Sequence, residues 1–538
     1  MKTTMTSRTS RPERGTARGT LLAADRIVTL GHGRKAARAM VVRGSRVVWV
    51  GDDPEQAPPH GERVEFPGCV IGPAFVDAHV HLTPMGLALT GLDLSEVASG
   101  EELLQAVATY AGAHTGRVVW GHGFDPHGFP DELPTPEELA QAAEGRSVYL
   151  SQVDGHASLV DRRTLSAAPL ARSEGIERDR DGSPTGMLRR EANHIVRRWS
   201  VGAMEEAELD AARKEAVARA ASLGVASVHE MAGPDVMGLA DLDAWIAQSW
   251  PIEVVPYWAG LDVETAMARD LRQVGGDLFL DGSLGAHTAA LGRPYTDRRS
   301  TAGNLEFDDE TLTAWFLEAA RAGLQTSVHA IGDAAIEQAI RCWWRVADEL
   351  RSDGLHDAVR RGRHRLEHAE LLTTRMLDDI AELGLVVSAQ PAYETKWGME
   401  GGLYEKRLGR QRAATTNPFR AIADRGIGLA FGSDANVTPM DPWALVMAAQ
   451  HRRYEQHAVS RLEAVSMSTL GGRHAARQER FVGVVRAGMR ADVAVFEGDP
   501  YRAEDPRGTR CLATIVQGRV AHGDVSLPDA PGRVPTRS

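Results

Sequence analysis

Several apolar segments of the chain end in histidine or aspartate. FVDAHVH ends in His79 and His81, TSVHAIGD contains His329, RLEHAE contains His368, and LAFGSDA contains Asp434. Side chains at positions i and i+2 of a strand share one face, so the imidazoles of His79 and His81 can bind the same ion. Imidazole and carboxylate ligands suit Zn²⁺, and other divalent metals accept them as well. These residues therefore predict a metal site that holds one or two ions.

Asp434 is the candidate acid–base residue of this site. A carboxylate beside an activated water can accept the proton of that water and return it to a leaving nitrogen. His368 is the second candidate catalytic group, because it or His156 can stabilise the developing oxyanion. The structural alternative for Asp434 is a cap on the helix that follows it.

The elements that would bring these residues together are parallel strands. Eight apolar segments alternate with helical stretches, the pattern of a (β/α)₈ TIM barrel of the α/β class. A single buried histidine on a strand is usually a core residue, but histidines at several strand ends are hard to explain by packing. Polar side chains at the carboxyl ends of barrel strands are typical of catalysis. The eight predicted strands are 74–81, 225–231, 253–258, 277–282, 326–333, 365–370, 385–391 and 429–435.

The remaining parts of the chain are expected to surround this barrel. Short β-rich segments at 19–72 and 479–525 predict a small β-sandwich built from both ends, although two separate hairpins are an alternative. The barrel is expected over 73–478, with an inserted subdomain at 83–222, after the first strand, covering its mouth. Alternatively, RVVWGHGFD and SVYLSQVDGH within the insertion are barrel strands and two of the eight are not. Residues 1–18 and 526–538 are expected to be tails.

Aromatic residues supply the candidate substrate pocket. The insertion contains Trp120, together with Phe124, Phe129 and Tyr149, and these side chains either line an apolar pocket or pack the core of the insertion. Tyr393 and Trp397 follow the seventh predicted strand on the mouth side, where barrel loops form the site. An apolar or aromatic amide would fit such a lining.

The composition limits the partners. The 538 residues are 43% hydrophobic and 25% charged with a net charge of −12, which fits a globular protein and disfavours nucleic acid as a partner. The three cysteines have no spacing typical of a thiolate site or a disulfide framework, so we expect a cytoplasmic location. No apolar stretch is long enough to span a membrane, and the basic N-terminal tail lacks the apolar core of a signal peptide.

Taken together, these segments resemble the amidohydrolase superfamily, in the YtcJ-like branch that includes N-substituted formamide deformylase. Further matching segments are DGHASLV, LFLDGSLGAHTAAL and GMRADVAVFEGDP. The resemblance implies a barrel with a composite β-sandwich, and metal ligation by His79, His81, His329 and His368. It implies that Asp434 is both a ligand and a proton shuttle, and it suggests that Asp154 and His156 in the insertion face the substrate. Homodimers are common among such relatives, but no residue here requires one.

One position departs from the family pattern. Many relatives place a carboxylated lysine on the fourth strand, where this chain has Asp277, and none of its five lysines lies on a predicted barrel strand. Either Asp277 bridges two ions, or the site holds one ion, and we favour one. Asp281 is the other candidate, since it shares a strand face with Asp277. His287 stands where relatives often carry arginine and is either a substrate contact or an exposed loop residue.

The predicted activity is hydrolysis of a C–N bond in an amide- or formamide-like small molecule. A deaminase and a hydrolase of cyclic amides, carbamates or esters are alternatives on the same site, because the barrel does not select the substrate. A regulatory protein that kept the fold without catalysis is the alternative from another class.

Overall fold

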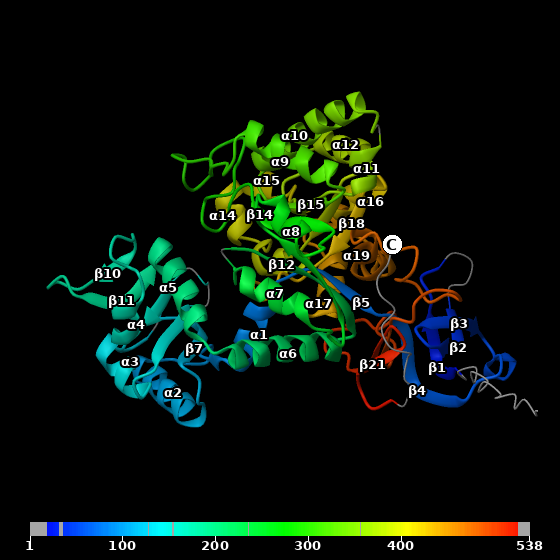
Figure 1. The fold of residues 1–538 in the computed structure, drawn as a ribbon, viewed down its shortest axis with the longest axis horizontal. Coiled ribbons are helices and arrows are strands. Elements are labelled where there is room, and N and C mark those ends of the chain that lie inside the picture. The colour runs from blue at the N-terminus through cyan, green and yellow to red at the C-terminus, as the bar shows by residue number, and fades with distance from the viewer. Residues whose placement is uncertain are drawn as a thin grey trace, which may run out of the picture.

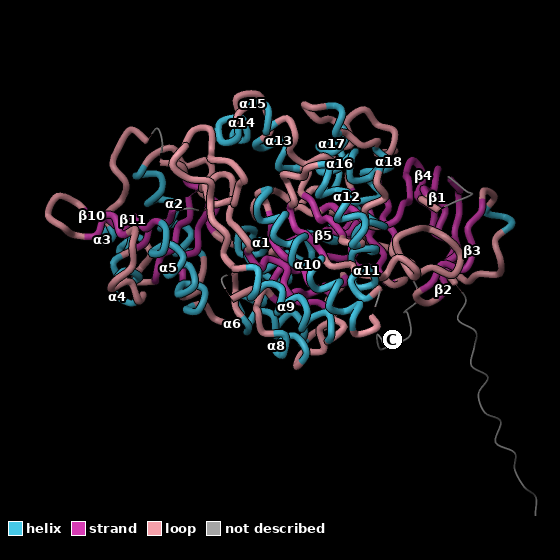
Figure 2. Tube along the Cα trace, turned by 90° about the horizontal axis from the view of Figure 1, so that it is seen from above, coloured by secondary structure: helices cyan, strands magenta, loops and turns pink. Residues whose placement is uncertain are grey.

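The computed structural model describes residues 19–31, 36–126, 129–152, 155, 157–234, 236–355 and 357–525. Three parts follow one another across the molecule (Figure 1). A block of parallel strands and helices lies in the middle, and the inserted segment and a sheet built from both chain ends flank it. The view from above shows the two flanking parts at opposite ends as well (Figure 2).

Eight parallel strands form the middle part, and each overlaps one of the eight predicted segments, although the fourth runs from Gln273 to Phe279 and ends before the predicted residues 280–282. They belong to two sheets, one of three strands in the order β13-β12-β5 and one of five in the order β14-β15-β16-β17-β18. An isolated parallel bridge between Val80 and Ala435 links the end of β5 to the segment after β18. The strands are β5 (Phe75–Val80), β12 (Val225–Ala232), β13 (Glu253–Trp258), β14 (Gln273–Phe279), β15 (Gln325–Ala330), β16 (Arg365–His368), β17 (Val386–Ala389) and β18 (Gly428–Phe431).

Helices follow most of these strands and bury one apolar face each. In α10 (Asp333–Ser352) the buried residues Ile336, Ile340 and Trp343 recur at helical spacing, and Trp343 stacks on Phe316 of α9 (Asp309–Arg321). Because the helices cover the strands, the strand segments are apolar almost to their ends. The other helices of this part are α6 (Glu206–Ser222), α7 (Leu239–Ala247), α8 (Val263–Met267), α11 (Ala358–Gly362), α12 (Thr374–Leu383), α13 (Ala392–Trp397), α14 (Leu403–Leu408), α15 (Arg410–Ala413), α16 (Phe419–Asp424), α17 (Pro442–Gln450), α18 (Arg461–Ser466) and α19 (Gly472–Ala475).

The inserted segment forms a sheet of its own, with the strand order β10-β11-β9-β8-β7-β6. The two segments that were alternative barrel strands are β7 and β8 of this sheet, so that alternative is wrong. Its elements are α1 (Leu82–Thr90), β6 (Leu92–Asp93), α2 (Gly100–Ala113), β7 (Val118–Phe124), α3 (Pro136–Ala142), β8 (Ser147–Gln152), β9 (Ala157–Val160), α4 (Arg162–Ala167), β10 (Ile176–Arg178), β11 (Pro184–Arg189) and α5 (Arg190–Ala203).

Both chain ends contribute to one continuous seven-stranded sheet with the order β21-β20-β19-β4-β1-β2-β3. The antiparallel pairing of β4 with β19 joins the two ends, so the alternative of two separate hairpins is wrong. The strands are β1 (Thr20–Val28), β2 (Ala36–Arg43), β3 (Arg46–Gly51), β4 (Glu62–Pro73), β19 (Val493–Glu497), β20 (Cys511–Val516) and β21 (Arg519–His522). Only Ala74 separates β4 from β5, so this sheet is coupled directly to the strand that carries His79. Within the described ranges, no helix has both the length and the apolar character that crossing a membrane requires.

Candidate functional site

Six side chains from five of the parallel strands, or from the residues just after them, converge at one place. His79 and His81 belong to the end of β5, Asp277 to β14, His329 to β15, His368 to β16, and Asp434 follows β18. They form three overlapping groups whose potential ligand atoms lie within 4.8 Å of one another. This convergence follows from parallel strands, whose carboxyl ends meet at one edge.

Asp277 lies between the two pairs of histidines. Its Oδ2 is 3.0 Å from Nε2 of His81, and its Oδ1 is 3.4 Å from Nε2 of His79. The same Oδ1 is 3.7 Å from Nδ1 of His329 and 3.7 Å from Nε2 of His368. The carboxylate at the position of the family lysine therefore faces all four imidazoles.

The atoms that face the centre of this cluster have no hydrogen-bond partner. Such atoms are His79 Nε2, His329 Nδ1, His368 Nε2, Asp277 Oδ1 and Asp434 Oδ1, and all of them are buried. Buried polar atoms are nearly always paired, and five that point at one another are a specific exception. Nitrogen and carboxylate oxygen donors of this kind fit a divalent cation such as Zn²⁺.

The electrostatics of the cluster also favour a cation. Burial lowers the pKa of His81, but hydrogen bonds and charges from Asp277 and Asp434 outweigh it and raise that pKa to about 10. For His79, burial is likewise outweighed by Asp277 and Asp434, and its pKa lies well above the ordinary value. The negative charges of the two carboxylates thus favour positive charge at this place. A bound metal ion would supply that charge in place of protons on the imidazoles.

The outer nitrogen of three imidazoles is held by a neighbour. His79 Nδ1 lies 2.8 Å from Oε2 of Glu367, His81 Nδ1 lies 3.1 Å from the carbonyl oxygen of Met231, and His368 Nδ1 lies 2.8 Å from Oε1 of Gln390. An acceptor at Nδ1 favours a proton there, which leaves Nε2 as the free donor atom. Each ring is therefore oriented toward the cluster before any ion binds.

Glu367 is in turn held by a buried arginine. Arg365 Nε and Nη2 donate to its two carboxylate oxygens at 2.7 and 3.0 Å, and Ser327 Oγ also donates to it. Burial raises the pKa of Glu367, but Arg365 and His79 outweigh it and lower that pKa to about 2. The carboxylate beneath His79 is therefore ionised.

Asp434 is fixed by contacts on both sides. The hydroxyl of Tyr393 donates to Oδ2, so Oδ1 is the oxygen that faces His81 Nε2 at 3.3 Å. A Cβ atom on Gly432 would come within 2.5 Å of the backbone nitrogen of His79, so glycine is what lets this segment approach β5. Asp434 and His368 also have positive φ angles of 52° and 66°, a strained conformation that is often found at functional sites.

Asp281 lies outside the six-residue cluster, although its Oδ1 is 3.7 Å from Nε2 of His329, the ring nitrogen that faces away from the centre. Its carboxylate accepts hydrogen bonds from the backbone nitrogens of Ala290, Ile331 and Gly332 at 2.8, 3.0 and 2.8 Å. Asp281 therefore connects the loops after β14 and β15. Of the two aspartates, Asp277 on β14 is the one that belongs to the cluster.

Tyr393 and Trp397 lie beside the cluster. The Tyr393 ring is nearly parallel to the His368 ring at 6.0 Å between centroids, and Trp397 packs edge-on against Tyr393 at 4.4 Å. Because the Tyr393 hydroxyl binds Asp434, this residue contacts the candidate acid–base group directly. His287 lies farther out, where its Nε2 pairs with Asp297 at 3.1 Å.

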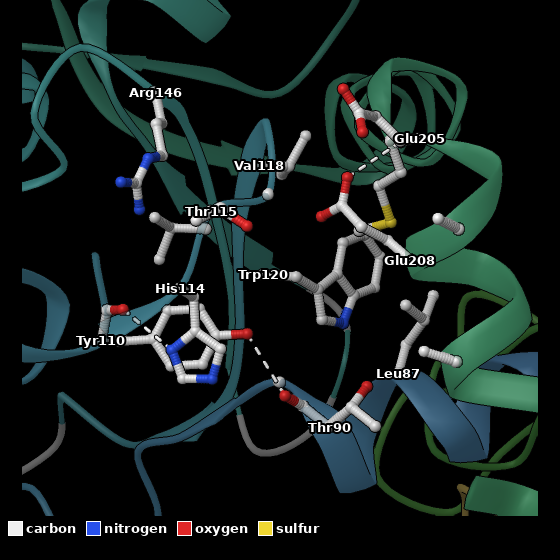
Figure 3. A pocket seen from close by; sticks show the side chains of 16 residues that line it. Leu87, Thr90, Tyr110, His114, Thr115, Val118, Trp120, Arg146, Glu205 and Glu208 are labelled. Atoms are coloured by element: carbon white, nitrogen blue, oxygen red, sulfur yellow. Dashed lines mark hydrogen bonds between the residues drawn. The ribbon is translucent and has the colours of Figure 1, made fainter. Parts of the chain in front are cut away.

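Trp120 packs at the joint between the insertion and the middle part. Its indole stacks on Tyr149 at 4.4 Å between ring centroids. It also lines a cavity of about 330 Å³. Leu87 and Glu208 line the same cavity (Figure 3). None of the six clustered residues lines this cavity. Phe124 and Tyr149 are buried, so core packing accounts for these aromatic residues of the insertion. Asp154 and His156 lie outside the described residues.

Sequence reasoning missed several residues around the site. Arg365 was detectable as a charged residue two positions before Glu367 on a strand that is buried throughout, where both side chains share one face. Phe279, whose ring centroid is 4.6 Å from that of His329, and Lys396 carried no signal in their local sequence.

Comparison with known proteins points to one family. The model of the amidohydrolase family matches residues 67–522. YtcJ of Bacillus subtilis is 28% identical and aligns with 86% of this chain and 91% of its own length. N-substituted formamide deformylase of Arthrobacter pascens is 24% identical, with 90% and 94% covered. The solved structure of an uncharacterized metal-dependent hydrolase from Pyrococcus furiosus has a TM-score of 0.75 and 27% identity, with 90% of this chain and 100% of that chain covered.

Proposed function

Because the chain belongs to the amidohydrolase family, we propose that it hydrolyses the C–N bond of an amide- or formamide-like small molecule at the six-residue cluster. The observation that carries this proposal is the set of buried, unpaired nitrogen and oxygen atoms that face one another there. The likeness to N-substituted formamide deformylase supports the choice of bond.

His79, His81, His329, His368, Asp277 and Asp434 would hold the metal, with Zn²⁺ as the first candidate. When bound, such an ion supplies Lewis acidity and makes water ionisable near neutral pH. Asp277 belongs to two of the three ligand groups, which supports it as the ligand that connects the histidine pairs.

Side chains of the site then transfer the proton from the water to the leaving nitrogen. Asp434 Oδ1 accepts a proton from the attacking water, while Tyr393 holds Oδ2 and so keeps the carboxylate in position. Asp434 returns this proton to the leaving nitrogen, which would otherwise leave as a very poor amide anion. Glu367, Gln390 and the Met231 carbonyl keep the imidazoles in place during the reaction.

We also propose that the eight parallel strands close into a TIM barrel and that the terminal sheet curves into a β-sandwich. The bridge between Val80 and Ala435 supports closure, because it links the first and last strands of the series. A core shared by strands from both chain ends supports the sandwich.

The test combines metal analysis with a substrate panel. The purified protein should contain a divalent metal by elemental analysis and release amine from at least one N-formyl or N-acyl amine. His79→Ala should lower both the metal content and the turnover. Bound metal without turnover of any amide, or hydrolysis of esters alone, would overturn the C–N assignment.

A further inference from the structure

Lys396 contacts the loop that carries Asp434. It follows Tyr393 by three residues on α13, so the two side chains share one helix face. Tyr393 donates to Asp434, and Lys396 Nζ donates to the carbonyl oxygen of Val437 at 2.9 Å. The Val437 nitrogen in turn binds the Asp434 carbonyl oxygen at 2.6 Å. One face of α13 therefore delivers a hydroxyl to the candidate acid–base residue and an ammonium to the loop beside it.

No carboxylate forms an ion pair with Lys396 within the described part of the chain. The acidic residues nearby in sequence are engaged elsewhere. Glu394 is buried and accepts from Asn417 at 2.7 Å and from Arg452 at 3.1 Å. Glu400 and Glu405 both pair with Arg453, at 3.7 and 2.8 Å. Lys214 is a contrast, since its Nζ lies 2.6 Å from Asp210 on α6.

The surroundings of Lys396 are partly apolar. Its Nζ lies 5.2 Å from the centroid of the Trp397 ring. Val437, whose carbonyl oxygen accepts from Lys396, exposes 39% of its surface, and Met399, nearby in sequence, exposes 57%, which leaves apolar side chains for a ligand to cover. Partial burial lowers the pKa of the Lys396 ammonium, and the Asp434 carboxylate raises it. The Lys396 side chain is exposed, so an incoming anion can reach this ammonium and form a charge-assisted hydrogen bond with it.

We propose that Lys396 binds a carboxylate of the substrate, so that the preferred substrates are amides that carry an anionic group as well as the scissile C–N bond. One of the three ammonium donors is used by Val437, and the other two are available to the ligand. The inference rests on the proposed hydrolase function and deepens it, since it names the class of amide.

The experiment compares two substrates that differ only in the carboxylate, N-acetylphenylalanine and N-acetylphenethylamine, or the corresponding N-formyl pair. The wild type should hydrolyse the acid with the higher kcat/KM. Lys396→Met should raise KM for the acid by about 10- to 100-fold, the range expected for loss of a hydrogen bond to a charged group, with little change in kcat. KM for the neutral amide should not change. Lys396→Arg should restore part of the preference.

Lys214→Met, which also removes a lysine, is the control and should leave both substrates unaffected. Metal content and thermal stability of each variant show that a change in KM does not reflect misfolding. If the wild type hydrolyses both substrates equally and Lys396→Met changes neither, the role of Lys396 is overturned while the amidohydrolase function stands. If it hydrolyses neither member of either pair but does hydrolyse other, neutral amides, the carboxylate inference fails alone. If no amide is hydrolysed, both proposals fail.

Discussion

Single side chains of the cluster have separable roles, because the hydrogen bonds of each one differ. Asp434 has one oxygen bound to Tyr393 and one that faces the imidazoles, whereas Asp277 has both oxygens near imidazole nitrogens. This difference fits the proposed roles, in which Asp434 moves a proton and Asp277 binds the ion. Substitution by asparagine keeps the shape of each side chain and removes its charge, so it distinguishes the two roles.

Asp434→Asn should retain most of the metal and lose about 10²- to 10⁴-fold in kcat, because the amide cannot accept the proton of the water. Elemental analysis and steady-state kinetics measure the two quantities on one preparation. Turnover close to that of the wild type would remove Asp434 from the proposed proton transfer.

Asp277→Asn should lower the number of metal ions bound per chain, because the carboxylate that faces all four imidazoles loses its charge. Asp281→Asn is the matched comparison on the same segment, and it should keep the metal while destabilising the loops that it ties. An unchanged metal content in Asp277→Asn would argue against its role as a ligand.

At the level of elements, β16 combines a candidate ligand with the residues that support another one. His368 is the last residue of β16, and Glu367, the residue before it, holds the Nδ1 atom of His79 on β5. Arg365 crosses the interior and donates to Glu367, to the Tyr257 hydroxyl at 2.8 Å and to the Ala78 carbonyl oxygen at 2.7 Å. A four-residue strand thus connects β5, β13 and the cluster.

Arg365→Met should lower the free energy of unfolding by about 3–5 kcal/mol, because it leaves the Glu367 carboxylate buried without its cation. Chemical denaturation of the metal-free protein measures this effect without a contribution from bound ions. Arg375→Met on the exposed side of α12 is the control and should change little. Equal stability of the two variants would mean that Glu367 does not depend on Arg365.

At the level of the whole molecule, the site depends on strands that are far apart in the sequence. β5 and β18 come together only when the parallel series is complete, and the terminal sheet continues directly into β5. An ion held by five of these strand ends would cross-link the middle part, so binding and global stability should be coupled.

Removal of the metal with a chelator should therefore lower Tm, and added Zn²⁺ should restore it. At a free metal concentration about 100 times Kd, one ion stabilises the fold by about 2.7 kcal/mol. Thermal unfolding followed by circular dichroism measures the shift, and His79→Ala should show a smaller response to Zn²⁺. An unchanged Tm after verified loss of the ion would contradict this coupling.

Local sequence was sufficient to predict where the parallel strands lie and which five of the six clustered residues meet. Strand positions follow from short apolar segments, and the rule that parallel strands expose their ends at one edge predicted that His79, His81, His329, His368 and Asp434 would meet. Long-range contacts were required to distinguish Asp277 from Asp281, which alternation along a strand places on the same face. The backbone nitrogens that bind Asp281 come from segments up to 51 residues away, and no local pattern encodes them. For the same reason, local sequence did not predict that the Tyr393 hydroxyl binds Asp434, 41 residues later in the chain.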